Sequence, residues 1–225
     1  MEFRSYLRGG LLFCAIIASV SLVIFNSARA AVPIPSPNTD APLSKTKGEQ
    51  TVVLGGGCFW GVQAVFQHVK GVTQATSGYS GGSSATADYE KVSAGDTGHA
   101  ESVKITYDPS QISYGQILRI FFSVAHDPTE LNRQGPDSGT QYRSVIFFTN
   151  AEQQRIAQAY IAQLGAAKVF SRPIVTQLVP LKAFYQAEDY HQDYAIHHPN
   201  TPYIVVNDAP KVDHLRQEFP GFFAK

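Results

Sequence analysis

The sequence predicts an α+β fold in which helices pack on an open sheet. The first observation is the order of periodic segments, which reads strand, helix, strand, strand, helix, strand, helix, strand along the chain. Segments that mix in this way form a sheet covered by helices. The second is composition, because 225 residues of which 44% are hydrophobic suffice for one domain with a sizeable core.

Residues 1–30 have the features of a secretory signal. Arg4 and Arg8 precede a long uncharged run, and Ala28-Arg29-Ala30 offers a small-residue cleavage site before Ala31. We therefore expect an exported, periplasmic protein. The alternative is an uncleaved membrane anchor that leaves the domain facing the periplasm, since the run is long for a signal but short for a membrane span.

Residues 31–48 carry four prolines among polar residues and show no periodicity, so they are predicted to form a flexible, partly extended linker. Residues 49–225 are predicted to be the catalytic domain. Once the signal is removed, Cys58 is the only cysteine left, and an internal disulfide framework is excluded. The net charge of zero and the lack of a basic cluster give no support for nucleic-acid binding.

The domain begins with a strand, a glycine-rich turn and a helix. Residues 51–54 form a β-branched run typical of a buried strand, and residues 62–69 place apolar side chains at helical spacing. Cys58 lies on the turn between them. Unpaired N–H groups and the helix dipole favour a thiolate there, so its pKa is expected to be lowered. The alternative is a buried structural cysteine.

A second strand, residues 72–82, leads into a loop over residues 81–98 whose one large aromatic residue is Tyr89. Loops of this length are often functional, although Tyr89 could equally pin the loop to the core. Residues 101–107 then alternate, with Glu101 at the end of the apolar face. Charge is disfavoured there, so the pKa of Glu101 is expected to rise and to make it a proton donor. A frayed strand end that turns Glu101 into water is the alternative.

Ser113 and Gln116 form a capping box that opens a helix, and His126-Asp127-Pro128 ends it. A polar loop, residues 129–141, precedes a continuous apolar strand over residues 144–149, which suits the inside of a sheet.

Asn150 is the predicted cap of the next helix. A strand over residues 174–179 and an aromatic, polar segment over residues 184–198 follow. A short helix from Pro210, with Asp208 as its cap, ends the pattern.

Neither a dinucleotide nor a metal cofactor is expected. The spacing Gly55-x-Gly57-x-x-x-Gly61 resembles a dinucleotide fingerprint, but no acidic residue occurs between Thr51 and Ala87 to bind a ribose. The spacing of His191, His197 and His198 matches no strong metal-ligand motif.

Two alternatives for Cys58 stay open on these grounds. In a Cys–His hydrolase, His99 or His126 would bond the thiol and activate it toward an acyl group. In a non-enzymatic binding module, Cys58 could be replaced without loss. The sequence also offers an acid and tyrosines around a thiol, a combination that suits reduction of a sulfoxide because it can protonate an oxygen leaving from sulfur.

Five blocks of the chain resemble, in the same order, the blocks of A-type peptide methionine sulfoxide reductases, and they span about residues 50–220. Together they make the resemblance far more specific than any one motif. The blocks are Gly57-Cys58-Phe59-Trp60-Gly61, Gly78-Tyr79-Ser80-Gly81-Gly82, Gly95-Asp96-Thr97-Gly98-His99-Ala100-Glu101, Gly139-Thr140-Gln141-Tyr142-Arg143-Ser144 and Ala187-Glu188-Asp189-Tyr190-His191-Gln192.

The resemblance implies a function for each matching residue. Cys58 would attack the sulfoxide sulfur and become a sulfenic acid, and Glu101 would protonate the sulfoxide oxygen. Tyr89 and Tyr142 would hydrogen-bond that oxygen, with Asp137 in the same pocket.

The resemblance also implies a substrate site and a fold. Phe59 and Trp60, with Gly57 beside them, would bind the substrate's methyl group. The substrate would be the S epimer of methionine sulfoxide, free or in proteins, which makes repair of oxidised proteins the expected function. The implied fold is an α/β roll of ferredoxin-like type with a central mixed β-sheet flanked by helices, and no cofactor is implied.

The chain departs from many relatives because it has no cysteine after Asp193. We therefore expect the single-catalytic-cysteine form, regenerated by a thioredoxin-like or glutaredoxin-like protein or by a small thiol. A monomer is expected, in contact with a membrane only if residues 1–30 are retained.

Overall fold

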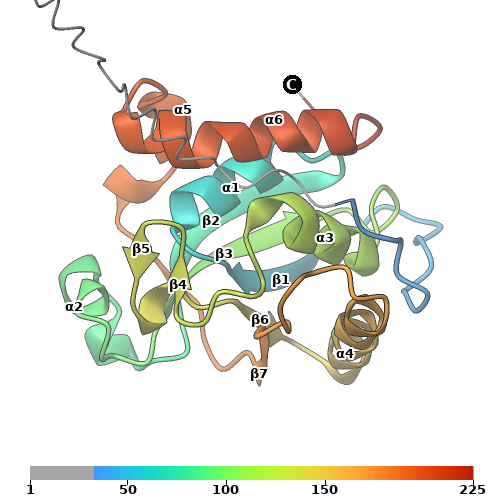
Figure 1. Ribbon diagram of the computed structural model, residues 1–225, viewed down its shortest axis with the longest axis horizontal. Helices are drawn as coiled ribbons and strands as arrows, with labels where there is room; N and C mark the ends of the chain where they lie inside the picture. The colour runs from blue at the N-terminus through green and yellow to red at the C-terminus, as the bar shows by residue number, and fades with distance from the viewer. Residues whose placement is uncertain (1–32, 225) are drawn as a thin grey trace, which may run out of the picture.

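A six-stranded sheet lies at the centre of the computed structural model, which describes residues 33–224 (Figure 1). The strand order is β7-β6-β1-β3-β2-β8; β6 and β7 are parallel, and the other neighbouring pairs are antiparallel. The sheet is therefore mixed, and the predicted α+β fold is confirmed. Its strands are β1 (Gln50–Gly55), β2 (Val72–Ser80), β3 (Ala100–Tyr107), β6 (Val145–Phe148), β7 (Gln177–Pro180) and β8 (Tyr185–Gln186).

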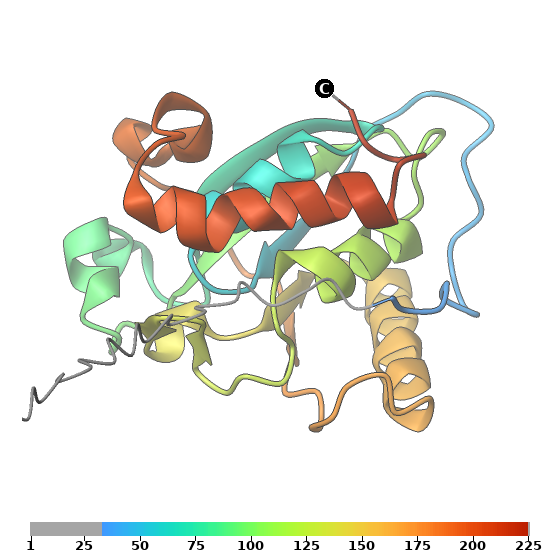
Figure 2. The ribbon, with the colours of Figure 1, turned by 45° about the horizontal axis from the view of Figure 1, so that its top comes forward.

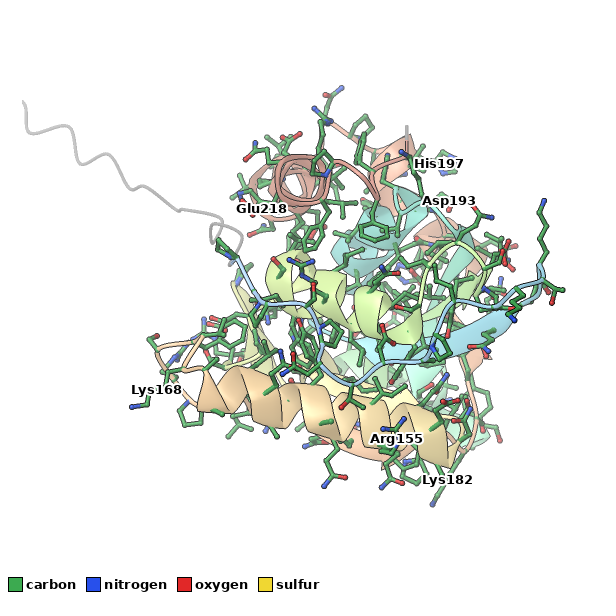
Figure 3. All side chains as sticks on the ribbon, turned by 90° about the vertical axis from the view of Figure 1, so that its right-hand side faces the viewer. Arg155, Lys168, Lys182, Asp193, His197 and Glu218 are labelled. Carbon is green, nitrogen blue, oxygen red and sulfur yellow. The ribbon has the colours of Figure 1, made fainter. Side chains whose placement is uncertain are left out.

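Helices bury one face of this sheet in a single large core. Apolar side chains of that face, such as Leu54 and Val103, belong to the same buried cluster as the inner residues of every long helix. Helix α6 crosses α1 on the outside (Figures 1 and 2), and Figure 3 shows α6 at the top and α4, between the labelled Arg155 and Lys168, at the bottom. These helices are α1 (Phe59–Gln67), α3 (Tyr114–Ile120), α4 (Ala151–Ala166) and α6 (Ala209–Glu218).

The opposite face of the sheet carries a smaller apolar cluster. Val53, Val145 and Phe147 are fully or almost fully buried there, against partly buried residues that follow β7, among them Leu181 and Phe184. The two faces explain why β6 is apolar throughout: it is buried on both sides, as the continuous pattern of its residues indicates.

Two of the three predicted helix caps, Ser113 and Asn150, make their side-chain cap bonds. The Ser113 hydroxyl accepts from the backbone N–H of Gln116, and the Gln116 side chain accepts from the backbone N–H of Ser113, which completes the capping box. The helix continues as a π-helix over Phe121–Ala125. At α4, the Asn150 side chain accepts from the N–H of Gln153.

The loops between these elements carry short helices and strands of their own. The long loop after β2 contains α2 (Tyr89–Ser93). The polar loop before β6 forms a small hairpin of β4 (Arg133–Gln134) and β5 (Asp137–Ser138). The aromatic segment contains α5 (Tyr194–His197).

The described part of the expected linker, residues 33–48, is extended but packed on the domain, which corrects the prediction that it is flexible. Ile34 is buried, and its carbonyl accepts from Arg119 Nε at 3.1 Å. The Tyr160 hydroxyl donates to the Pro35 carbonyl at 2.7 Å, and Asp40 accepts from the N–H of Gly115 at 2.8 Å. Figure 3 shows this segment crossing α3 and α4. The polar, proline-rich composition of the segment suggested a free linker, because composition alone does not show these few contacts with the domain.

Among residues 33–224, no helix is long and apolar enough to cross a membrane. The expected signal over residues 1–30, including Cys14, lies outside the described residues.

Candidate active site

Cys58 lies at the N-cap of α1, directly after the glycine turn that follows β1, as the sequence predicts. The turn requires glycine at position 57, because Gly57 has φ +87° and a Cβ there would lie 2.5 Å from the Cγ of Gln134. The side chain of Cys58 is 8% exposed, so the thiol is almost enclosed by the fold.

The pKa of the Cys58 thiol is raised well above its usual range, which corrects the prediction of a lowered value. Burial is the main cause, and the carboxyl groups of Glu101 and Asp208 add to it. The N–H of Trp60 and the Lys211 ammonium lower the pKa, as a helix start does, but desolvation outweighs them. The resting thiol is therefore neutral.

Glu101 is the second residue of β3 and points into the main core. It is 4% exposed, and its Oε2 accepts from the backbone N–H of Phe59 at 2.9 Å. Burial raises its pKa to about 8 in spite of that hydrogen bond, with smaller contributions from Asp137 and Asp208. The predicted rise is confirmed, and most Glu101 side chains carry a proton at neutral pH.

Tyr89 and Tyr142, both expected in the site, are brought to the same centre. Each is partly buried, and burial raises the pKa of each phenol. The charges of Glu101 and Cys58 raise both pKa values further, since both groups lie near both phenols. The two phenols therefore remain neutral O–H donors.

Asp137 comes to this centre on β5. Its Oδ2 accepts from the hydroxyl of Tyr203, a residue that the sequence did not point to. Burial raises the pKa of Asp137, while Tyr203 and Lys211 lower it. Tyr203 comes from the C-terminal segment, 66 residues further along the chain, and its sequence context shows no sign of this contact.

Phe59 and Trp60 form an aromatic wall at the start of α1. Their ring centroids are 6.5 Å apart, and Phe59 lies 5.0 Å from the ring of His191. Trp60 is stacked on Tyr194 at 3.8 Å, with the edge of Tyr203 at 5.9 Å. The wall therefore combines residues from both ends of the domain.

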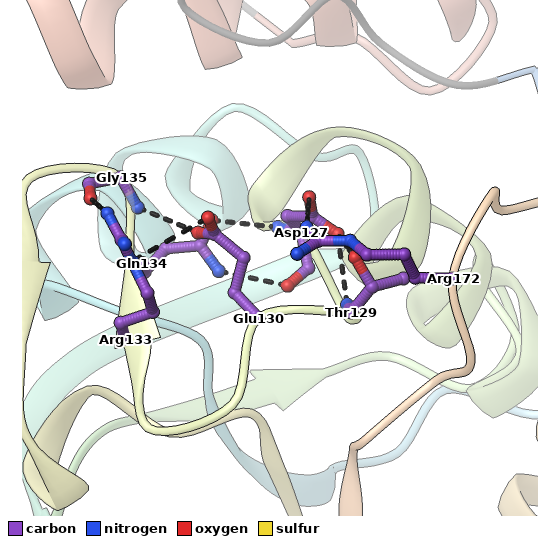
Figure 4. A network of polar contacts seen from close by, with 7 residues as sticks. All are labelled: Asp127, Thr129, Glu130, Arg133, Gln134, Gly135 and Arg172. Carbon is purple, nitrogen blue, oxygen red and sulfur yellow. Dashed lines mark hydrogen bonds and ion pairs between the residues drawn. The ribbon is translucent and has the colours of Figure 1, made fainter.

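A polar network supports the β4–β5 hairpin that carries Asp137 (Figure 4). The side chain of Gln134 accepts from the N–H of Asp127 at 2.9 Å and donates to its carbonyl at 3.1 Å. Glu130 accepts from the N–H of Gly135 at 2.8 Å, and Arg172 contacts the Asp127 carboxylate at 3.5 Å. The hairpin is thus tied to Asp127 and Glu130, in the segment that precedes it.

The two histidines proposed for a Cys–His hydrolase are engaged elsewhere. The ring nitrogens of His99 bond the N–H of Gly82 at 3.2 Å and the carbonyl of Ser83 at 2.9 Å. Those of His126 bond the carbonyl of Phe121 at 3.1 Å and the hydroxyl of Ser144 at 2.7 Å. Because the ring nitrogens of both imidazoles bond these groups, neither of the two histidines is arranged as the base of a Cys–His hydrolase.

The family model "Peptide methionine sulfoxide reductase" matches residues 50–221, most of the chain. The chain belongs to this family. The peptide methionine sulfoxide reductase MsrA 2 of Mesorhizobium japonicum is 60% identical over 79% of this chain and 91% of its own length. MsrA 2 of Synechocystis is 53% identical over 83% of this chain and 88% of its own.

Solved structures agree with this assignment. The reduced form of Mxr1 from Saccharomyces cerevisiae has 30% identity and a TM-score of 0.62, covering 76% of this chain and 96% of its own. Methionine sulfoxide reductase A of Corynebacterium diphtheriae has 31% identity and a TM-score of 0.59, covering 81% of this chain and 94% of its own. The expected enzyme class, a peptide-methionine (S)-S-oxide reductase, is confirmed.

Beside its thiol this reductase has an ion pair between Asp208 and Lys211. The sequence had predicted a different role for Asp208. Asp208 was expected to cap the last helix, but its side chain makes no cap bond; its Oδ1 accepts from Lys211 Nζ at 3.1 Å. Asp208 is fully buried, and a Cβ at Gly61 would lie 2.1 Å from its Oδ1. One feature of the sequence could have indicated this close contact: Gly61 is a glycine inside a helix, and such a glycine often has a packing reason.

Proposed function

We propose that this reductase converts methionine S-sulfoxide, free or in proteins, to methionine through a sulfenic acid on Cys58. The observation that carries the proposal is a buried thiol at a helix start beside a buried carboxyl group whose pKa is about 8, with neutral phenols around both. This set can deliver a proton to an oxygen that leaves sulfur, and it contains no base arranged to activate water.

The carboxyl group of Glu101 is suited to donate that proton. Its Oε2 already accepts from the N–H of Phe59, which leaves Oε1 to carry the proton toward the substrate. Tyr89 and Tyr142 would donate further hydrogen bonds to the oxygen, and these bonds strengthen as negative charge develops on it. Phe59 and Trp60 would receive the substrate's methyl group, with Gly57 beside them.

The first step balances without water or cofactor. The sulfur of Cys58 bonds to the substrate and takes its oxygen, so the substrate sulfur is reduced to a sulfide and Cys58 is oxidised to a sulfenic acid. Glu101 gives its proton to the oxygen and recovers one from the thiol. The raised pKa of Cys58 suits this exchange, because the thiol stays protonated until the substrate is in place.

The second half of the cycle would use an outside thiol. The sequence holds two cysteines, and Cys14 lies in the expected signal, so the mature enzyme is of the single-cysteine form. A thioredoxin-like or glutaredoxin-like protein, or a small thiol, attacks the sulfenic sulfur, releases water and forms a mixed disulfide. A second thiol then restores Cys58 and leaves as a disulfide.

The expected location is the periplasm, where the enzyme would repair oxidised proteins. The charged and apolar pattern of residues 1–30 supports export with cleavage before Ala31. N-terminal sequencing of protein expressed with its signal tests this: a start at Ala31 in the soluble fraction is expected. An intact N-terminus in the membrane fraction would show an anchor instead.

Turnover of each epimer of methionine sulfoxide, with dithiothreitol as the thiol, tests the chemistry. We expect the S epimer to be converted to methionine and the R epimer to be left unchanged. Reduction of both epimers alike would contradict the proposed fit of the methyl group. No reduction of either, by a folded protein, would contradict the proposed function as a whole.

A further inference from the structure

Residues 187–194, called here the clamp segment, hold two parts of the active site at once. The carboxylate of Glu188 accepts from the Tyr79 hydroxyl at 2.8 Å and from the backbone N–H of Tyr89 at 3.0 Å, which fixes the start of α2. On its other side, His191 Nδ1 accepts from the indole N–H of Trp60 at 3.2 Å. The clamp segment thus connects a phenol of the oxygen site to the wall of the methyl site.

The ring of His191 occupies the space between these parts. It is 2% exposed and lies 4.5 Å from the ring of Tyr89 and 5.0 Å from that of Phe59. Burial lowers the pKa of this imidazole, which keeps it neutral, so Nδ1 is available to accept from Trp60. A displacement of His191 would move both aromatic groups.

The side-chain amide of Gln192 fastens the clamp segment to the edge of β2. Its Oε1 accepts from the N–H of Ser77, while its Nε2 donates to the carbonyls of Ser77 and Ala187, each at 3.0 Å. The amide therefore pairs with Ser77 as a neighbouring strand would. Just upstream, β8 makes the ordinary backbone pairing with Gly78 and Tyr79.

Gln63 of α1 holds the same amide from the helix side. Its Nε2 donates to Gln192 Oε1 at 3.2 Å and to the carbonyl of Ala75 at 3.0 Å, and its Oε1 accepts from the N–H of Asp193 at 3.0 Å. Gln63 is 1% exposed. Asp193, labelled in Figure 3, has φ +56°, so the chain turns sharply at the point where Gln63 binds it.

We propose that the amide pair Gln63–Gln192 is the positioning device of this active site. By setting the clamp segment against α1 and β2, it places His191 and Glu188, and through them Trp60 and Tyr89, in the geometry that binds the sulfoxide. The inference rests on the proposed function and adds two residues that act through others. Amides are required at both positions because each side chain donates and accepts at once, which a carboxylate cannot do.

Gln192→Glu tests the proposal, because it keeps the size of the side chain and removes both donors. An oxygen would then face the carbonyls of Ser77 and Ala187, and the clamp segment should shift. We expect KM for the S-sulfoxide to rise about tenfold, the scale of one or two lost hydrogen bonds, with a smaller change in kcat. Trp60 is the only tryptophan, so its fluorescence should move to longer wavelength and be quenched more easily by acrylamide.

Gln186→Glu is the matched control, since it adds the same charge on the exposed edge strand β8. It should leave KM and the fluorescence unchanged. If Gln192→Glu does not fold, Gln192→Asn, which shortens the side chain, is measured in its place. A KM and a fluorescence spectrum like those of the parent in the folded variant would overturn the proposal, even if the melting temperature fell.

A double-mutant cycle with Trp60→Phe separates positioning from general loosening. If Gln192 acts through the His191–Trp60 bond, Gln192→Glu should raise KM by a much smaller factor in the Trp60→Phe background, where that bond is absent, than in the parent. If the fold-increase in KM of the double variant equals the product of those of the two single variants, Gln192 does not act through Trp60. Turnover by the parent enzyme tests the proposed function on its own, so failure of the two ideas is distinguishable.

Discussion

Glu101 shows at the scale of a single residue how burial sets up the chemistry. A carboxyl group at the end of a strand usually bends into water, but this one is 4% exposed and accepts an N–H from the first helical residue after Cys58. Desolvation raises the pKa of Glu101 by more than that hydrogen bond lowers it, so the pKa is about 8. The protein therefore keeps a proton donor beside the thiol at neutral pH.

The reduction step should depend on the proton of Glu101. Because the protonated acid is the active form, single-turnover rates should be level below neutral pH and fall as pH rises through about 8. Glu101→Gln keeps a similar shape but transfers no proton readily, so we expect a rate about a hundredfold lower and without that fall. Rapid-quench assays of product methionine measure both. A variant rate within a few-fold of the parent would assign Glu101 to structure alone.

At the scale of an element, α1 depends on a glycine that helix propensity disfavours. Gly61 faces the buried Asp208 and Lys211, and an added Cβ would lie 2.1 Å from the Asp208 oxygen and 2.6 Å from the Lys211 nitrogen. Asp208 is fully buried, so its carboxylate cannot move aside into solvent. The first turn of α1, which carries Cys58 at its cap, can approach the C-terminal segment only because position 61 has no side chain.

Gly61→Ala should therefore destabilise the protein even though alanine is the better helix former. The gain in propensity of about 1 kcal/mol is smaller than the strain of an overpacked core, about 1–3 kcal/mol. Urea denaturation measures the difference. Gly165→Ala in the last turn of α4 is the control: nothing lies within 4 Å of its added Cβ, so it should be neutral or stabilising. A Gly61 variant as stable as the control would contradict the packing argument.

The elements were largely predictable from local patterns, and the contacts between them were not. The capping box of Ser113 joins residues close in sequence, and the alternation of residues 101–107 was enough to place Glu101 on a buried face. The pairing of Gln63 with Gln192 joins residues 129 positions apart, which no periodicity records. The pKa of Cys58 was mispredicted for the same reason, since the helix start is local but the burial that outweighs it comes from the tertiary fold.

At the scale of the whole molecule, the segment before β1 acts as a strap across the helical layer. Asp40 is its anchor: the carboxylate accepts from the Ser113 hydroxyl and from the N–H of Gly115, in the first turn of α3. A negative charge there also suits the helix dipole. The strap lies on α3 and α4 (Figure 3), and its Pro35 carbonyl accepts from the Tyr160 hydroxyl of α4.

Asp40→Ala should lower the free energy of unfolding by about 1–3 kcal/mol, since it leaves the first turn of α3 with unpaired donors. The activity of the folded variant should match the parent. Asp213→Ala is the control, because its ion pair with Arg216 is more than half exposed on both sides and such pairs contribute little. Equal urea midpoints for the two variants would show that the strap is not anchored through Asp40.

A single turnover without reductant tests the central claim, that Cys58 alone takes the oxygen, most directly. The mature protein is mixed with excess methionine S-sulfoxide, and both the methionine formed and the mass of the intact protein are measured. We predict one methionine per chain and a protein one oxygen heavier, with dimedone attached at Cys58 when it is present. Cys58→Ser should fold and yield no methionine. Methionine formed by that variant, or by the parent with Cys58 unmodified, would contradict the account.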